Sequence, residues 1–187
     1  MAAFAVAVVA LTLVAGCGAQ GSSAGASDTP ARDSRGGSPD FELPTLDGGS
    51  VRLSDHLGRD VVLIDFWATY CEPCLRAMPE LDALYRRHRA RGFVVLGVSI
   101  DGADSLPEVR AETRKLGISF PILLDHDTRV VALYNPKTSA PFSVLIARDG
   151  SVLHKKEGYT TGSSTALGAD IEAALLLPQL AGARPPP

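Results

Sequence analysis

Apolar runs of two kinds alternate along the chain between residues 38 and 178. Two continuous runs, residues 61–68 and 93–100, have the length and the β-branched content of strands that are buried on both faces. Between them, apolar residues recur every three or four positions over residues 71–91, which predicts an amphipathic helix. Because a strand, a helix and a second buried strand form a parallel pair with a right-handed crossover, the pattern predicts a βαβ unit.

Shorter elements surround this unit, and their patterns are typical of hairpins and short helices. An Asp-Gly-Gly turn joins the first predicted hairpin, and an Arg-Asp-Gly-Ser turn joins the second, which adds an antiparallel edge to the sheet. The predicted elements are a hairpin at 41–43 and 50–53, an inserted helix, strand and helix at 106–116, 120–125 and 129–134, a hairpin at 142–147 and 152–158, and a helix at 165–177. The sequence therefore predicts an α/β fold with a central mixed β-sheet flanked by helices.

The N-terminus has the pattern of an export signal. Residues 1–16 are almost wholly apolar and end in Leu-Val-Ala-Gly before Cys17. This run is shorter than the about 20 residues of a membrane-spanning helix and fits a secretory signal. Its end resembles the lipobox of bacterial lipoproteins, so we predict a lipoprotein signal peptide over 1–16 with Cys17 as the lipidated residue. An uncleaved anchor or an ordinary signal remains the alternative, since the first basic residue is Arg32.

The remaining organisation follows from composition. Residues 17–37 are rich in Gly, Ser and Ala and predict a flexible tether, while residues 179–187 predict a disordered tail. A globular domain is expected over 38–178. The net charge of -3 gives no reason to expect a nucleic-acid partner. We expect a protein that is exported and lipid-anchored to a bacterial membrane, facing the periplasm or the cell exterior.

Cys71 and Cys74 stand where the first buried strand meets the long helix. A helix N-terminus carries unpaired N–H groups and a partial positive charge, and both stabilise a thiolate. Cys71, at the first turn, is expected to be the exposed nucleophile. Cys74, one turn later, is expected to face the core and to resolve a mixed disulfide. Pro73 suits the first helical turn, where its missing N–H costs nothing.

Two carboxylates could tune this pair. Glu72 places a negative charge beside Cys71, which should raise the thiol pKa and make the couple a stronger reductant. Asp65 lies inside the apolar strand, where burial should raise its pKa. It could accept the proton of Cys74 when the mixed disulfide resolves, or it could simply cap a loop.

Other uses of the two cysteines fit less well. With Cys17 assigned to lipid, only two thiols remain, whereas a structural zinc site needs four Cys or His ligands. The histidines show no ligand spacing; they are His56, His88, His126 and His154. A structural disulfide that closes so small a loop would stabilise little. A thiol peroxidase would carry its reactive cysteine in a different loop, rich in Pro and Thr.

Residues 66–79, FWATYCEPCLRAMP, resemble the active-site segment of thioredoxin-fold proteins. They are most similar to the TlpA/ResA-like thiol–disulfide oxidoreductases, relatives of the AhpC/TSA proteins. The resemblance implies a thioredoxin-like fold with an N-terminal β-hairpin and a central αβ insertion. It also implies that Trp67 packs near the active site, that Pro141 is a cis-proline beside the sulfurs, and that the Ala140 backbone pairs with a substrate peptide.

The predicted function is therefore an extracytoplasmic, membrane-tethered reductase of protein disulfides. Its partners would be client proteins with cysteines or disulfides and an upstream membrane electron donor, and the protein would be a monomer. No cofactor is needed, because the dithiol carries the electrons. Ala77 replaces an acidic residue that is common in relatives of cytochrome c maturation, which weakens that specific role. The alternatives are a copper-delivery or redox-sensing module, with His126 and His154 as loose candidate ligands, and a thiol peroxidase.

Overall fold

The computed structural model describes residues 37–160 and 162–177, together with Met1. The predicted signal peptide, Cys17, almost all of the tether and the predicted tail lie outside these residues. None of the helices in the described part of the chain has both the length and the apolar character needed to cross a membrane.

A mixed sheet of five strands forms the centre of the fold, in the order β5–β4–β3–β6–β7. Strands β3 (Val61–Trp67) and β4 (Phe93–Ser99) pair in parallel, and every residue of both is buried. Strand β5 (Ile122–Leu124) continues the parallel half, whereas β6 (Phe142–Ile146) and β7 (Val152–Glu157) are antiparallel. The predicted βαβ unit and the antiparallel edge are therefore confirmed.

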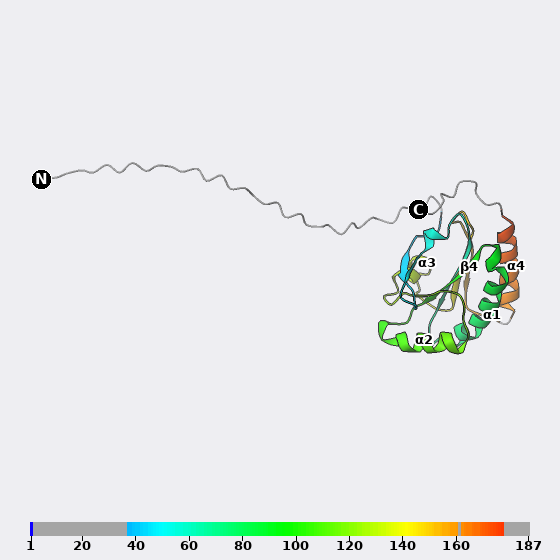
Figure 1. Ribbon diagram of the computed structural model, residues 1–187, viewed down its shortest axis with the longest axis horizontal. Helices are drawn as coiled ribbons and strands as arrows, with labels where there is room; N and C mark the ends of the chain where they lie inside the picture. Colours follow the sequence, from blue (N-terminus) through cyan, green and yellow to red (C-terminus); the bar gives the residue numbers. More distant parts are fainter. Residues whose placement is uncertain (2–36, 161, 178–187) are drawn as a thin grey trace. The chain divides into compact units, whose positions relative to one another are not determined.

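Helices α1 (Glu72–His88) and α4 (Ser163–Leu176) lie side by side against one face of the sheet, as Figure 1 shows. Helix α3 (Arg129–Tyr134) lies on the opposite side of the sheet, and helix α2 (Leu106–Lys115) connects β4 to β5. Alternation along β3 explains the two faces, because successive side chains of a strand point to opposite sides. Phe66 packs against Tyr134 of α3, and the centroids of these two rings are 5.9 Å apart. The centroid of the Phe66 ring also lies 6.2 Å from that of the Phe142 ring.

The N-terminal hairpin is formed by β1 (Glu42–Pro44) and β2 (Ser50–Arg52), which pair antiparallel. Its turn places Gly48 at a φ of 94°, a backbone conformation that glycine adopts without strain. Phe41, next to β1, packs edge-on against Tyr134, so the hairpin covers the α3 side of the core. The described residues also include three single turns of 3-10 helix, at Leu53–Asp55, Arg89–Arg91 and Ala103–Ser105.

Two helix boundaries differ by two or more residues from those predicted. The long helix ends at His88, and its expected last turn is the 3-10 segment Arg89–Arg91, which Gly92 closes at a φ of 81°. Helix α4 begins at Ser163, two residues before the predicted start at Thr165. The Ser163 hydroxyl accepts hydrogen bonds from the Thr160 N–H and from the Lys156 ammonium, which fixes the first turn to β7. This contact between distant residues leaves no periodic signal in the sequence.

Candidate redox site

The two cysteines of the Cys-Glu-Pro-Cys motif form a disulfide, with an S–S distance of 2.01 Å. Cys71 is the N-cap residue of α1, and its carbonyl accepts the first helical hydrogen bond, from the Leu75 N–H. Its sulfur accepts the N–H of Cys74 at 3.3 Å. Pro73 lies in the first turn, as expected. The helix N-terminus is therefore directed at the Cys71 sulfur, which is the arrangement that stabilises a thiolate after reduction.

The two cysteine residues differ in exposure, although less than the sequence suggested. Cys74 is completely buried, as predicted, whereas Cys71 keeps 7% of its surface exposed. The expectation that Cys71 is openly exposed is therefore wrong. The reason is the turn before it, in which the Cys71 N–H bonds to the Ala68 carbonyl and folds the residue back against the sheet. The exposed residue of this turn is Tyr70, at 76%.

Glu72 points into solvent, with 83% of its side chain exposed, and pairs with Arg76 at 2.6 Å. The two residues are one helical turn apart, the spacing at which a carboxylate and a guanidinium meet on a helix surface. Arg76 was not identified from the sequence, although this spacing could have revealed it. The positive charge of Arg76 partly offsets the negative charge of Glu72. The electrostatic effect on Cys71 is therefore the sum of the two charges.

Asp65 is buried in the middle of β3, with 5% of its surface exposed. Burial raises the pKa of its carboxyl to about 7, as the sequence predicted in direction. The side chain lines a cavity of about 30 Å³ together with Pro141, Ser143 and Ala77. Neither sulfur lines this cavity. The arrangement gives a carboxyl group that can gain or lose a proton close to neutral pH.

The remaining predicted residues lie at the end of β3 and directly before β6. The peptide bond between Ala140 and Pro141 is cis, as the family resemblance implied. Pro141 leads directly into β6, and its carbonyl accepts the Gly158 N–H at 2.8 Å. Trp67 ends β3 and is fully buried, and its indole N–H has no hydrogen-bond partner among the described residues. The structure thus brings Asp65 and Pro141 to one cavity and places Trp67 in the core.

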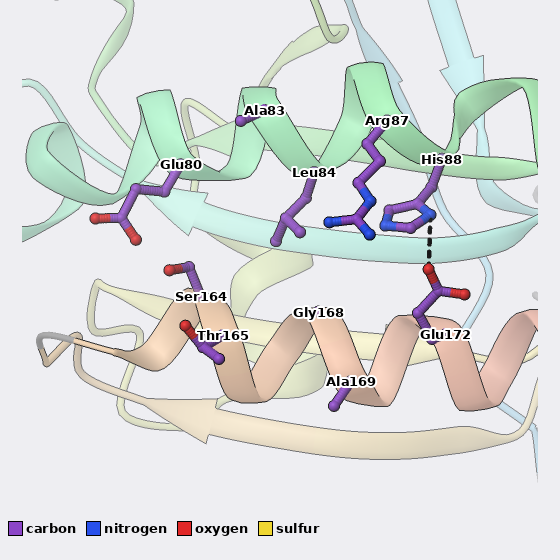
Figure 2. Close-up of a pocket in the computed structure, with 10 residues that line it drawn as sticks. All are labelled: Glu80, Ala83, Leu84, Arg87, His88, Ser164, Thr165, Gly168, Ala169 and Glu172. Atoms are coloured by element: carbon purple, nitrogen blue, oxygen red, sulfur yellow. Dashed lines mark ion pairs between the residues drawn. The ribbon is translucent and has the colours of Figure 1, made fainter.

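A larger groove of about 530 Å³ runs between α1 and α4, but it contains neither cysteine (Figure 2). At one end His88 faces Glu172 across the gap, 3.6 Å apart. Burial lowers the pKa of His88. At the other end Glu80 faces Ser164, and hydrogen bonds to Ser164 and Tyr159 lower the pKa of the Glu80 carboxyl. The contacts of His88 with Glu172 and of Glu80 with Ser164 join the two helices.

Within residues 37–160 and 162–177, no group of three or more Cys, His, Asp or Glu side chains could hold a metal ion. His126 instead bonds through Nδ1 to the Asp101 carbonyl, and His154 lies 3.8 Å from Asp170. The loose copper ligands considered from the sequence are thus not brought together in this part of the chain.

One residue near the motif went unnoticed in the sequence. Asp101 follows β4 and is 2% exposed, and its carboxylate accepts hydrogen bonds from the backbone and hydroxyl of Thr69. Thr69 belongs to the turn that carries Cys71. The signal that could have found Asp101 is its position, because the carboxyl ends of adjacent parallel strands meet at one edge of a sheet.

The chain was compared with known protein families, with curated proteins and with solved structures. A model of the AhpC/TSA family matches residues 37–155. The chain therefore belongs to the AhpC/TSA family. It is also similar to proteins named thiol-disulfide oxidoreductase ResA. The match to that of Geobacillus kaustophilus is 38% identical over 114 residues, 61% of this chain and 63% of the relative. That of Bacillus anthracis is 30% identical over 123 residues, 66% of this chain and 69% of the relative.

The similar solved structures, like the relatives found by sequence, include proteins named for thiol–disulfide exchange. A candidate thiol:disulfide interchange protein DsbE from Chlorobium tepidum aligns with a TM-score of 0.69 and 34% identity, over 74% of this chain and 95% of that one. The MTB protein dsbF aligns with a TM-score of 0.63 and 25% identity, over 72% and 94% of the two chains. The predicted thioredoxin-like fold is confirmed. The chain combines that fold with the Cys71–Cys74 disulfide, and its relatives and structural neighbours include proteins named as thiol–disulfide oxidoreductases.

Proposed function

We propose that the protein is an extracytoplasmic thiol–disulfide oxidoreductase, tethered to a membrane through Cys17, that reduces disulfides of client proteins. The observation that carries this proposal is the Cys71–Cys74 disulfide at the N-terminus of α1, in which Cys71 keeps 7% of its surface exposed and Cys74 keeps none. A sulfur in this position is stabilised as a thiolate by the helix end, and the thiolate is the form that attacks disulfides.

In the first step, the reduced protein attacks a client. The Cys71 thiolate forms a bond to one client sulfur, the client S–S bond breaks, and the other client sulfur leaves as a thiolate. Cys71 is the attacking residue because Cys74 has no exposed surface. The product of this step is a mixed disulfide between Cys71 and the client.

In the second step, Cys74 loses its proton and attacks the Cys71 sulfur. The mixed disulfide breaks, the second client thiolate leaves, and the Cys71–Cys74 disulfide forms. Two electrons have then passed to the client. Asp65 is the proposed acceptor of the Cys74 proton, since burial places the pKa of its carboxyl at about 7. A group with a pKa near the working pH transfers protons in either direction at little cost.

The cycle closes when an upstream thiol donor reduces the Cys71–Cys74 disulfide by the reverse exchange. The dithiol itself carries the electrons, so the proposal includes no cofactor. The membrane tether rests on the pattern of residues 1–17 in the sequence. Proteins named ResA and DsbE among the relatives and structural neighbours support the choice of a thiol–disulfide exchange reaction.

A disulfide reduction assay tests the activity. Reduced protein without its first sixteen residues is mixed with a disulfide-bonded protein substrate, and free substrate thiols are measured with time. We expect one substrate disulfide reduced per dithiol, no reaction with Cys71→Ser, and a stalled mixed disulfide with Cys74→Ser. Reduction of the substrate by Cys71→Ser would contradict the proposal.

A labelling experiment tests the tether separately. The full-length chain is expressed in a bacterium that is fed a radioactive fatty acid, with a Cys17→Ala variant as the control. We expect label in the first protein and none in the second. Label in neither protein would reject lipidation of Cys17 and leave the redox activity untouched.

A further inference from the structure

The turn that presents Cys71 is held at its centre by one buried carboxylate. Both oxygens of Asp101 lie 3.1 Å from the Thr69 N–H nitrogen, and the Thr69 hydroxyl donates to Oδ1 at 2.6 Å. Asp101 is 2% exposed, so the acceptor carboxylate is shielded from bulk water. Hydrogen bonds to a charged acceptor in such surroundings are the stronger ones in proteins.

The position of Asp101 explains why a carboxylate is used there. The β3–β4 ladder ends at Trp67 and Ser99, and one further backbone bond joins the Ile100 N–H to the Trp67 carbonyl at 2.9 Å. Beyond that point the chains diverge, and the Thr69 N–H would lose its strand partner. The Asp101 side chain supplies the acceptor that the Thr69 N–H lacks beyond the end of the ladder.

Asp101 is itself fixed on two further sides. The Ser99 hydroxyl donates to Oδ2 at 2.8 Å, and the Asp101 N–H donates to the Ser99 oxygen at 3.2 Å. The Asp101 carbonyl accepts a hydrogen bond from Nδ1 of His126, at 3.0 Å, which follows β5. The carboxyl ends of three neighbouring strands therefore converge on the turn before Cys71. Every hydrogen bond to the carboxylate comes from a neutral donor.

We propose that Asp101 is a positioning residue of the redox site: through Thr69 it holds the turn 68–71 so that the Cys71 sulfur stays at the N-terminus of α1. This inference rests on the proposed function, because it concerns the rate at which Cys71 exchanges disulfides. It assigns to the loop at the end of β4 a part in the reaction that the cysteine motif alone does not reveal.

The test compares an apolar and an amide replacement. Asp101→Leu is close in volume and removes both acceptors, whereas Asp101→Asn keeps one oxygen for Thr69 and can donate to the Ser99 hydroxyl. The rate constant for the reaction of reduced protein with an aromatic disulfide reagent is measured from pH 5 to 10. We expect Asp101→Leu to lower the high-pH plateau, where Cys71 is fully ionised, about tenfold or more, and Asp101→Asn to stay within about threefold of wild type. A fall of the plateau separates lost positioning from a changed thiol pKa.

Asp125 offers a matched control. It is a fully buried aspartate after β5 that accepts the N–H groups of Val130 and Val131, and it makes no hydrogen bond to the turn before Cys71. Asp125→Leu should reduce stability without lowering the exchange plateau. Equal losses of rate in Asp101→Leu and Asp125→Leu, or no loss in either, would overturn the proposal.

A second variant covers the case in which Asp101→Leu does not fold. Thr69 is partly exposed, and Thr69→Val removes only its hydroxyl while Thr69→Ser keeps it. We expect about threefold slower exchange for Thr69→Val and a wild-type rate for Thr69→Ser; identical rates in both would overturn the proposal. Absence of exchange in the wild-type protein would contradict the proposed function. Exchange in the wild type that Asp101→Leu and Thr69→Val do not slow would contradict only the role of Asp101.

Discussion

Asp65 and Pro141 line the same cavity of about 30 Å³, so the buried carboxyl and the loop with the cis peptide bond meet beneath the redox helix. Asp65 is held there by its place in β3, opposite Ser143 of β6 and Gly97 of β4. Its raised pKa has burial as its cause. The fold therefore retains a carboxyl group that is costly to ionise, and this cost can be measured.

Replacement of Asp65 should make the oxidised protein more stable. The folded state holds the Asp65 proton up to about pH 7, whereas the unfolded chain loses it near the ordinary value of 3.8. Stability is therefore lost as pH rises between these two values, by at most about 4 kcal/mol. Asp65→Asn stays neutral, so urea unfolding should show it more stable than wild type at pH 8 and nearly equal at pH 3.5.

The exposed residue Asp104 provides the control for this comparison. Asp104→Asn should follow the wild-type stability curve at both pH values, since its side chain lies in solvent. An Asp65→Asn protein that is less stable than wild type at pH 8 would show that the carboxylate is stabilised by contacts, against the burial argument.

The same substitution should slow the second step of exchange. Without the Asp65 carboxylate, the Cys74 proton has to reach solvent directly. The mixed disulfide should therefore resolve at least about 10²-fold more slowly than in the wild type at pH 7. Attack by Cys71 on a client should change much less. Rapid-quench measurements of the mixed disulfide separate the two steps, and unchanged resolution in Asp65→Asn would remove Asp65 from the proton path.

Glu72 and Arg76 should shift the reduction potential in opposite directions. Glu72→Gln removes a negative charge next to the Cys71 thiolate, so the couple should become more oxidising, by about 10–20 mV for charges this exposed. Arg76→Gln leaves Glu72 uncompensated and should shift the potential the other way. Equilibration with glutathione buffers measures both.

The double variant supplies the control for this pair. Glu72→Gln combined with Arg76→Gln should have a potential close to wild type, because the two charges offset one another. Single variants that both leave the potential unchanged would mean that neither charge acts on the thiolate.

Gly97 should be intolerant of a side chain because of packing. A Cβ at this position would lie 2.7 Å from a ring carbon of Phe120 and 3.1 Å from Cδ1 of Ile122. Overpacking of a core of this kind costs about 1–3 kcal/mol. Gly97→Ala should therefore lower the urea midpoint, whereas Gly102→Ala, with open space at its Cβ, should leave it unchanged. Equal midpoints would mean that the side chains of Phe120 and Ile122 can move aside to admit a methyl group at residue 97.

Much of this fold was predictable because buried segments have recognisable patterns of apolar residues in the sequence. Strands β3 and β4 are buried on both faces, so their residues form almost continuous apolar runs, and the order of runs and helices predicts the parallel pair. The redox motif was predictable for a related reason: a strand followed by a helix start places Cys71 at an N-cap. The raised pKa of Asp65 followed from one charged residue inside an apolar run.

The parts that were missed depend on contacts between distant segments. Thr69 and Asp101 are polar residues at strand ends, where no periodicity marks a partner. The limited exposure of Cys71 results from the turn that folds it inward, and the helix position alone does not reveal that turn. The early start of α4 follows from the contact of Ser163 with Lys156 of β7. Such contacts are fixed by the assembled sheet and cannot be seen in a local pattern.

Capture of the mixed disulfide tests the central claim most directly. Reduced Cys74→Ser protein is incubated with a disulfide-bonded substrate, digested without reductant, and the cross-linked peptides are identified by mass spectrometry, with Cys71→Ser treated in parallel. The account predicts a covalent adduct through Cys71 in Cys74→Ser and none in Cys71→Ser. An adduct that forms through Cys74 in Cys71→Ser at a comparable rate, or the absence of any adduct on an accessible Cys71, would contradict it.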